Sequence, residues 1–253
     1  MDQETKTRLK GMRLGAMVQE IERQESFGST MDMSFDERMT LIIDKQWEKR
    51  LQNRLERNLK NAGIPNSSAC LSETNYTKNR GFKKSKIVQI GSCSWISNHL
   101  NLIITGPTGI GKSFFCSALG HEASVQGFKV KYYKTTRLVN ELNLGLANAK
   151  YEKILSELKK MDLLILDDFG IEILSTAASR DLLEVIDDRY NESKSTIFSS
   201  QLPVNKWVTI FKDKTIADAI LDRTVYKSIR LELDGPSMRE YYDVIKVNDY
   251  NSK

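Results

Sequence analysis

Cysteine, proline and histidine are scarce in this chain of 253 residues, which contains three, four and two of them respectively. The cysteines Cys70, Cys93 and Cys116 are far apart and show no metal-ligand spacing. This excludes a disulfide framework and a cysteine-based zinc site, and favours a reducing, cytoplasmic environment. No apolar run is long enough to span a bilayer, and no basic segment followed by an apolar core opens the chain. We therefore expect neither a membrane span nor a secretory signal.

Positive charge is concentrated in two segments, although the net charge is only +5. Residues 45–60 contain six basic residues against two acids, and residues 78–86 contain five and none. Such clusters are typical of surfaces that bind a phosphate backbone, but a solvated helix face or linker has the same composition. The candidate DNA-binding residues are Lys49, Arg50, Arg54, Arg57, Lys83 and Lys84.

A phosphate-binding loop is the most specific motif in the sequence. The pattern G-x-x-x-x-G-K-[ST] is matched at every fixed position by Gly106, Pro107, Thr108, Gly109, Ile110, Gly111, Lys112 and Ser113. An apolar run precedes the loop and a helix-compatible stretch follows it. We expect backbone N–H groups and Lys112 to hold phosphate oxygens, and the Ser113 hydroxyl to bind Mg²⁺. An ordinary glycine-rich turn would not explain the Lys-Ser pair.

Two adjacent carboxylates follow a second apolar run, Leu163 to Leu166. The run is typical of a strand buried on both faces of a parallel sheet, and ligands bind at the carboxyl ends of such strands. Asp167 is the candidate Mg²⁺ ligand, and Asp168 is the candidate base that polarises an attacking water. The alternative is that the two Asp residues only begin a polar loop after the strand. The presence of a phosphate loop in the same chain favours the functional interpretation.

The rest of the chain divides into three regions. Residues 1–65 are predicted to be a helical N-terminal DNA-binding or assembly domain, 66–86 a polar basic linker, and 87–253 an α/β ATPase domain. In the first region Ser34 and Glu37 fit a capping box. A stripe from Ile43 to Leu59 at i+4 spacing indicates packing in a core or against a partner helix. Strands are expected at 102–105, 130–133, 163–167, 196–199 and 229–233, and helices at 113–125, 137–147, 151–160 and 176–190.

Two arginines after the fourth and fifth predicted strands, Arg223 and Arg239, are candidates to neutralise charge on the γ-phosphate. Either residue could act within its own subunit or on a neighbour. A surface arginine, or local pairing of Asp222 with Arg223, is the structural alternative.

These segments resemble the IstB-type transposition helper ATPases of the AAA+ class, which are close to helicase loaders such as DnaC. The phosphate loop is shared by many families, whereas Gln201-Leu202-Pro203 and the segment from Ala217 to Arg223 are more specific. The resemblance implies a P-loop AAA+ ATPase core, with a parallel sheet flanked by helices, after a small all-helical N-terminal domain. It assigns Lys112 and Ser113 to Walker A, Asp167 and Asp168 to Walker B, sensor 1 to Ser200 with Gln201 as the weaker candidate, the arginine finger to Arg223 and sensor 2 to Arg239.

What the resemblance implies is a Mg²⁺-dependent ATPase that self-assembles on duplex DNA, remodels it and stimulates the transposase of the same element. The ATP sites would be shared between subunits, without any membrane association, in the bacterial cytoplasm at the nucleoid. One departure is Asp168, where many AAA+ ATPases carry Glu; the shorter side chain makes water positioning depend on assembly. A helicase loader is the alternative function, and a small-molecule phosphotransferase is the third hypothesis. The last has no use for a basic helical N-terminus.

Overall fold

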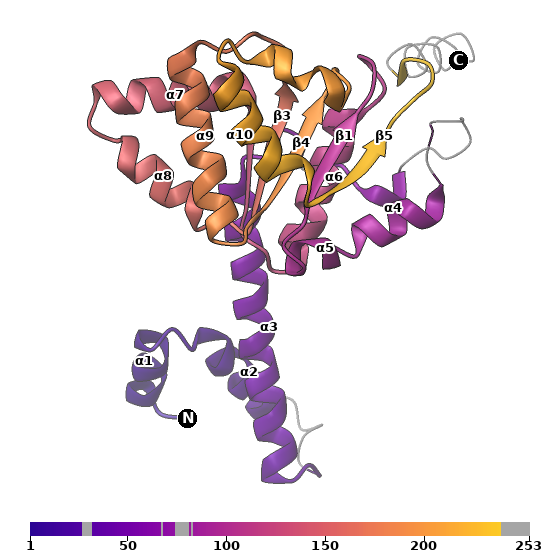
Figure 1. The fold of residues 1–253 in the computed structure, drawn as a ribbon. Coiled ribbons are helices and arrows are strands. Elements are labelled where there is room, and N and C mark those ends of the chain that lie inside the picture. Colours follow the sequence, from indigo (N-terminus) through magenta and orange to yellow (C-terminus); the bar gives the residue numbers. More distant parts are fainter. Residues whose placement is uncertain (27–31, 67, 74–80, 82, 239–253) are drawn as a thin grey trace, which may run out of the picture. The chain divides into compact units, whose positions relative to one another are not determined.

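The structure, a computed structural model, describes residues 1–26, 32–66, 68–73, 81 and 83–238 (Figure 1). Contacts within the chain divide it into two compact units, Met1–Arg57 and Asn58–Lys253. The helical N-terminal region falls in the first unit, and the sheet falls in the second. The bounds that the sequence suggests for the N-terminal domain and its linker stay a prediction, because part of 66–86 lies outside the described residues.

The first unit contains α1 (Gln3–Gly11), α2 (Gly15–Ser26) and most of α3 (Phe35–Ala62). The predicted capping box is confirmed: the Ser34 N–H donates to Glu37 Oε2 at 2.8 Å, and the Glu37 N–H donates to Ser34 Oγ at 3.3 Å. The side chain of Gln46 joins α3 to α2 by accepting a hydrogen bond from the Ala16 N–H at 3.2 Å. Beyond the helix Gly63 adopts a left-handed conformation, with a φ of 67°.

The apolar stripe on α3 is not buried as a core. The side chains of Ile43, Trp47 and Leu51 are 53%, 60% and 47% exposed. The neighbouring strip of the helix is the one that packs, through the buried Ile42 and Gln46. The core interpretation is therefore wrong for these three residues, and the exposed surface favours the other interpretation, packing against a partner helix.

Five parallel strands form the sheet of the second unit, in the order β2-β3-β4-β1-β5. Their bounds are β1 (Asn101–Thr105), β2 (Val130–Lys134), β3 (Leu163–Phe169), β4 (Ser195–Ser200) and β5 (Ser228–Glu232). The central strands β1, β3 and β4 are buried along almost their whole length. This explains why β1 and β3 contain continuous apolar runs rather than alternating patterns, whereas β4 is buried with serine and threonine on both sides of Ile197 and Phe198.

Helices cover both faces of this sheet (Figure 1). One face packs against α4 (Lys84–Gly91), α5 (Ser94–Ser97) and α6 (Lys112–Val125). The other packs against α7 (Thr135–Ala147), α8 (Tyr151–Lys159), α9 (Thr176–Asn191) and α10 (Lys214–Val225). Two 3₁₀ segments, η2 (Leu71–Glu73) and η3 (Val204–Ile210), complete the described elements. The predicted α/β architecture is confirmed, and every strand and helix that the sequence indicates in this unit is present within two residues of its expected ends.

Candidate nucleotide-binding site

The phosphate loop connects β1 to α6, as the motif predicts. Gly111 is the N-cap of α6 with a φ of 96°, a conformation that glycine adopts without steric cost. At Gly106 a side chain would collide with the carbonyl oxygen of Leu233, so only glycine lets the two backbones approach. Ile110 is fully buried in the core and anchors the loop. The loop therefore opens toward the N-terminus of a 14-residue helix, where anions are stabilised.

Lys112 lies within this loop. Its Nζ donates to the carbonyl oxygens of Gly106 at 2.7 Å and of Pro107 at 2.8 Å. Burial lowers the pKa of Lys112, and the carboxylates of Asp167 and Asp168 oppose that shift. The ammonium is thus held by loop carbonyls, close to the two acids and to the place where the motif predicts phosphate oxygens.

The two acids lie at an irregularity of the sheet. Along β3 and β4 the register runs from Leu166 opposite Phe198 to Phe169 opposite Ser200, so two residues of β3 face one of β4. Asp168 has a φ of 55° at this bulge, in the left-handed region that Asp tolerates better than most residues. Bulges of this kind change the direction of a side chain and recur beside functional sites. Here the bulge gives adjacent carboxylates different environments.

Asp168 is the more accessible acid. Its Oδ2 lies 3.4 Å from Nζ of Lys134, the last residue of β2. The side chain of Asp168 is 22% exposed and that of Lys134 is 62% exposed. An ion pair this open to solvent contributes little to stability, so the carboxylate can exchange its partner.

Asp167 is fully buried and has one free oxygen. Its Oδ2 accepts a hydrogen bond from the Tyr132 hydroxyl at 2.5 Å, and its backbone oxygen accepts one from the Thr135 hydroxyl at 3.0 Å. Within the described part of the chain, Asp167 Oδ1 is buried without a hydrogen-bond partner. A buried carboxylate oxygen without a partner is costly, and a hard cation or its water would satisfy it.

The oxygen donors Asp167 and Ser113 fit the chemistry of Mg²⁺. The described residues contain no cluster of three or more His, Cys, Asp or Glu side chains that could hold a metal. Proteins typically bind Mg²⁺ through one or two side chains together with substrate phosphates and waters.

The side chains of Ser200 and Gln201, the two candidates for the sensor 1 position, have different hydrogen-bond partners. The Ser200 hydroxyl is fully buried, donates to the Phe169 carbonyl at 2.6 Å and accepts from the Leu202 N–H at 3.1 Å. Both of its hydrogen bonds therefore serve the backbone. Gln201 is exposed, and its Oε1 accepts a hydrogen bond from the Thr108 hydroxyl of the phosphate loop at 2.6 Å. Gln201 is thus the residue of the two whose side chain contacts the phosphate loop.

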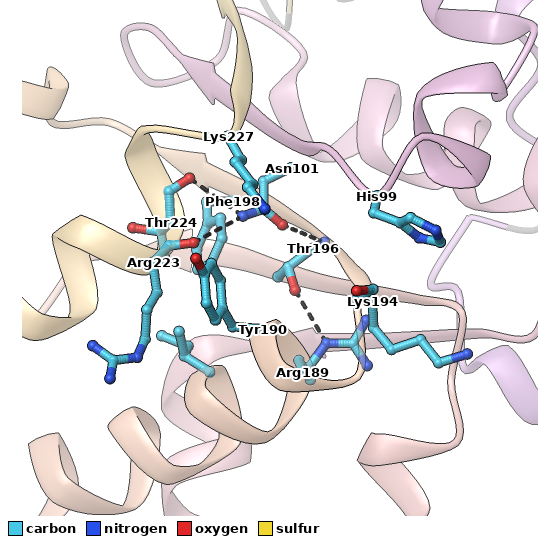
Figure 2. Close-up of a pocket in the computed structure, with 12 residues that line it drawn as sticks. His99, Asn101, Arg189, Tyr190, Lys194, Thr196, Phe198, Arg223, Thr224 and Lys227 are labelled. Carbon is cyan, nitrogen blue, oxygen red and sulfur yellow. Dashed lines mark hydrogen bonds between the residues drawn. The ribbon is translucent and has the colours of Figure 1, made fainter.

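Arg223 lies toward the opposite end of the sheet from the phosphate loop. The Asn101 side chain, at the start of β1, donates to the backbone oxygens of Arg223 and Thr224 at 3.3 Å each. The loop begins beyond the other end of this strand, about 13 Å away at the usual rise of a strand. The Arg223 guanidinium forms an ion pair with Asp187 of α9 and donates to the Ala219 carbonyl at 3.0 Å. Figure 2 shows it directed away from Asn101 and Thr196.

The cavity in Figure 2 is a structural feature at the amino ends of β1 and β4. Its volume of about 30 Å³ is too small for a nucleotide. The buried Arg189 closes it, donating to the backbone oxygens of Leu158 at 2.7 Å and Ser195 at 2.5 Å and to the Thr196 hydroxyl at 3.1 Å. This arginine joins α9 to β4, and its contacts are those of a core residue.

The remaining candidates are more dispersed. Arg239 lies outside the described residues. The side chains of all six candidate DNA-binding residues are exposed: Lys49, Arg50, Arg54 and Arg57 on α3, and Lys83 and Lys84 at the start of α4. Lys83 also lines a groove of about 520 Å³ beside the edge strand β5, together with Lys86, Arg230 and Glu232. Exposure is necessary for contact with a phosphate backbone, but it assigns no contact.

Three contacts of the candidate site were missed by sequence reasoning. Tyr132, Lys134 and Asp187 each bind a candidate residue through a side chain. Tyr132 and Lys134 belong to β2, and Asp187 belongs to α9. Only the position of Lys134, at the carboxyl end of a predicted strand, gave a signal that could have identified one of them.

Comparison with known proteins supports the interpretation of this site as an ATP-binding site. Residues 7–243 match the family described as IstB-like ATP binding protein. The chain is 41% identical over 203 residues to the ATP-binding protein of insertion sequence IS1162 from Pseudomonas fluorescens, an alignment that covers 80% of this chain and 87% of that protein. It is 36% identical over 235 residues to the insertion sequence ATP-binding protein y4pL of Sinorhizobium fredii, with 93% and 95% covered.

The fold is also that of a solved helicase loader. The crystal structure of the DnaC helicase loader superimposes with a TM-score of 0.54 at 21% identity, covering 66% of this chain and 97% of that one. This likeness concerns the P-loop AAA+ fold alone. No helix in the described ranges combines the length and apolar character needed to cross a membrane. The match over residues 7–243 and the two insertion-sequence relatives show that the chain belongs to the IstB-like ATP-binding protein family.

Proposed function

We propose that this protein is a Mg²⁺-dependent ATPase that assembles on duplex DNA, remodels it and stimulates the transposase of the same insertion sequence. The observation that carries the ATPase part is the combination of Lys112 in a phosphate loop with two acids at the carboxyl end of β3. The relatives supply the transposition context, because they are ATP-binding proteins of insertion sequences. Because the proposed substrate is DNA, we propose that the protein acts in the bacterial cytoplasm, at the nucleoid.

The two acids have separate proposed tasks. Asp167 and Ser113 hold Mg²⁺, which supplies positive charge at the terminal phosphates when it is bound. Asp168, accessible and only loosely paired with Lys134, orients the attacking water. Lys112 neutralises the β- and γ-phosphates, and Gln201 is well placed to contact the nucleotide beside Thr108.

Arg223 is proposed to act on a neighbouring subunit. Its backbone lies near the amino end of β1, whereas the phosphate loop of its own chain follows the carboxyl end of that strand. An arginine at this place serves hydrolysis more readily in a second copy than in its own chain. Arg239 is retained as the proposed sensor 2 residue from the sequence resemblance.

The proposed DNA contacts are the exposed basic residues on α3 and at the start of α4. The groove that contains Lys83, Lys86 and Arg230 adds a second basic surface in the ATPase unit. Because phosphate contacts carry no sequence information, such surfaces would support target binding without strong sequence preference.

The test is ATP turnover by the purified protein with and without duplex DNA, alongside the variant Asp168→Asn. The variant should still bind ATP and duplex DNA, while turnover should fall about a hundredfold or more because no carboxylate orients the water. Glu152→Gln removes one negative charge from an exposed position on α8 and is the matched control. ATP turnover that is unchanged by duplex DNA, or that is not reduced in the Asp168→Asn variant, would contradict the proposal.

A helicase loader is the alternative function, and the likeness to DnaC does not distinguish the two because it concerns the fold. Binding to the transposase encoded by the neighbouring reading frame separates them. The helper should bind that transposase when ATP and DNA are present, whereas a loader should bind a replicative helicase instead.

A further inference from the structure

Tyr132 contacts the Asp167 carboxylate from the neighbouring strand. In the sheet Tyr132 lies opposite Ile165, two residues before Asp167. Two residues of a strand span about 6.6 Å, a distance that a tyrosine side chain can bridge. The phenol runs along the sheet toward its carboxyl end, and its hydroxyl lies 2.5 Å from Asp167 Oδ2. Tyr132 is 7% exposed and Asp167 is fully buried, so the hydrogen bond is shielded from water.

The hydrogen bonds of Asp167 leave one specific atom free. An ionised carboxylate only accepts hydrogen bonds, so the hydroxyl of Tyr132 must be the donor. Thr135 fixes the backbone oxygen of the same residue. With Oδ2 and the backbone held, the partnerless Oδ1 has a fixed position.

We infer that Tyr132 is a positioning residue for Mg²⁺: its hydroxyl orients the Asp167 carboxylate so that Oδ1 is presented to the metal of a bound nucleotide. The inference rests on the proposed function, because Asp167 is the proposed ligand of Mg²⁺. It goes beyond that function by making metal affinity depend on a residue of β2, outside the Walker motifs. Partners that orient metal ligands typically contribute tenfold or more to metal affinity.

The variant Tyr132→Phe removes the hydroxyl and keeps the ring. Tyr133→Phe is the matched control, because Tyr133 is the next residue of β2 and packs into the cluster on the opposite face of the sheet. Binding of a fluorescent ATP analogue is measured in EDTA and then across a Mg²⁺ titration. For Tyr132→Phe the affinity in EDTA should match that of the unmodified protein, while the Mg²⁺ concentration at half-saturation should rise roughly tenfold. Tyr133→Phe should change neither value.

A purely structural role gives a different result. If Tyr132→Phe only loosens the fold, its affinity falls equally in EDTA and in Mg²⁺, and the inference is overturned. The ratio of the two affinities is internal to each variant, so a partly unfolded sample leaves the ratio unchanged. A half-saturation equal to that of Tyr133→Phe overturns the inference as well.

A double-mutant cycle identifies the partner through which Tyr132 acts. In the Asp167→Asn background, adding Tyr132→Phe should produce no further rise in the Mg²⁺ concentration at half-saturation. A full additional rise means that Tyr132 acts on the metal by another route and overturns the inference. If the unmodified protein binds the nucleotide without any Mg²⁺ dependence, the proposed metal-dependent ATPase fails, and that result is distinct from failure of the inference.

Discussion

Ser200 and Gln201 are adjacent at the carboxyl end of β4, but their side chains have different partners. The hydroxyl of Ser200 is buried and serves two backbone groups, whereas the amide of Gln201 is exposed and contacts Thr108 of the phosphate loop. A sequence position that suits a polar sensor can therefore be occupied by a residue whose hydrogen bonds belong to the fold. The adjacent residue, Gln201, is the one of the two whose side chain contacts the phosphate loop, and we propose that it takes the sensor role.

Substitution of each residue separates these roles. Gln201→Ala should lower ATP turnover about tenfold and leave the unfolding temperature unchanged, since it removes an exposed side chain beside the phosphate loop. Ser200→Ala should instead destabilise the protein by about 1–2 kcal/mol, because the buried Phe169 carbonyl and Leu202 N–H lose their partner. Thermal unfolding and steady-state turnover measure the two effects, with Asn205→Ala, an exposed residue of η3, as the control. A fully stable but inactive Ser200→Ala protein would return the sensor role to Ser200.

Helix α3 is the element in which sequence pattern and structure give the most specific expectation about DNA. Lys49, Arg50, Arg54 and Arg57 are all exposed on it. Reversing these four charges should weaken binding to duplex DNA irrespective of sequence. Each lost phosphate contact should reduce the slope of log affinity against log salt by roughly 0.9. Reversal of Lys10 and Arg13 in the same unit is the control. An unchanged slope would move the DNA contacts to α4 or to the groove beside β5.

Elements of the second unit were predictable where burial produces a continuous apolar run. β1 and β3 are such strands, and the acids after Leu166 were correctly placed at a carboxyl end. Other elements gave a weaker signal. α4 begins with basic residues and has no side-chain N-cap, so its first turn, residues 84–86, was included in the predicted linker. α10 was not predicted, although Asp213 is a residue type that favours the N-cap position of a helix. In the structure the Asp213 side chain caps α10 by accepting hydrogen bonds from two backbone N–H groups.

The contacts of the site were less predictable than its elements, for a physical reason. Tyr132 reaches Asp167 because β2 pairs with β3 in one particular register, and the bulge at Asp168 shifts the register between β3 and β4. Register is a property of two strands and does not follow from the spacing of residues along either one. The same applies to Arg223 and Asp187, which are brought together by the packing of α9 against α10.

At the scale of the whole molecule, the placement of Arg223 predicts that activity belongs to an assembly. Arg223→Ala and Lys112→Ala should each be nearly inactive, since an arginine supplied by a neighbour contributes on the order of a thousandfold to hydrolysis in P-loop enzymes. In an equal mixture that assembles head to tail, roughly a quarter of the interfaces would pair an intact loop with an intact arginine. Turnover of the mixture on saturating DNA should therefore recover in part. A mixture as inactive as its components would mean that Arg223 acts within its own chain or only stabilises it.

The distribution of tryptophan gives each compact unit its own optical reporter. Trp47 is exposed on α3 in the first unit, whereas Trp207 is fully buried in the second. The Trp207 ring lies 4.7 Å from that of Phe169, the residue that directly follows the two acids, and its indole N–H donates to the Leu202 carbonyl at 3.0 Å. With Trp95 replaced by phenylalanine, the emission of Trp207 reports on events at the nucleotide site. The emission of Trp47, which is exposed, reports separately on binding of a partner to α3. One unlabelled sample can therefore show whether nucleotide binding or coverage of α3 occurs first.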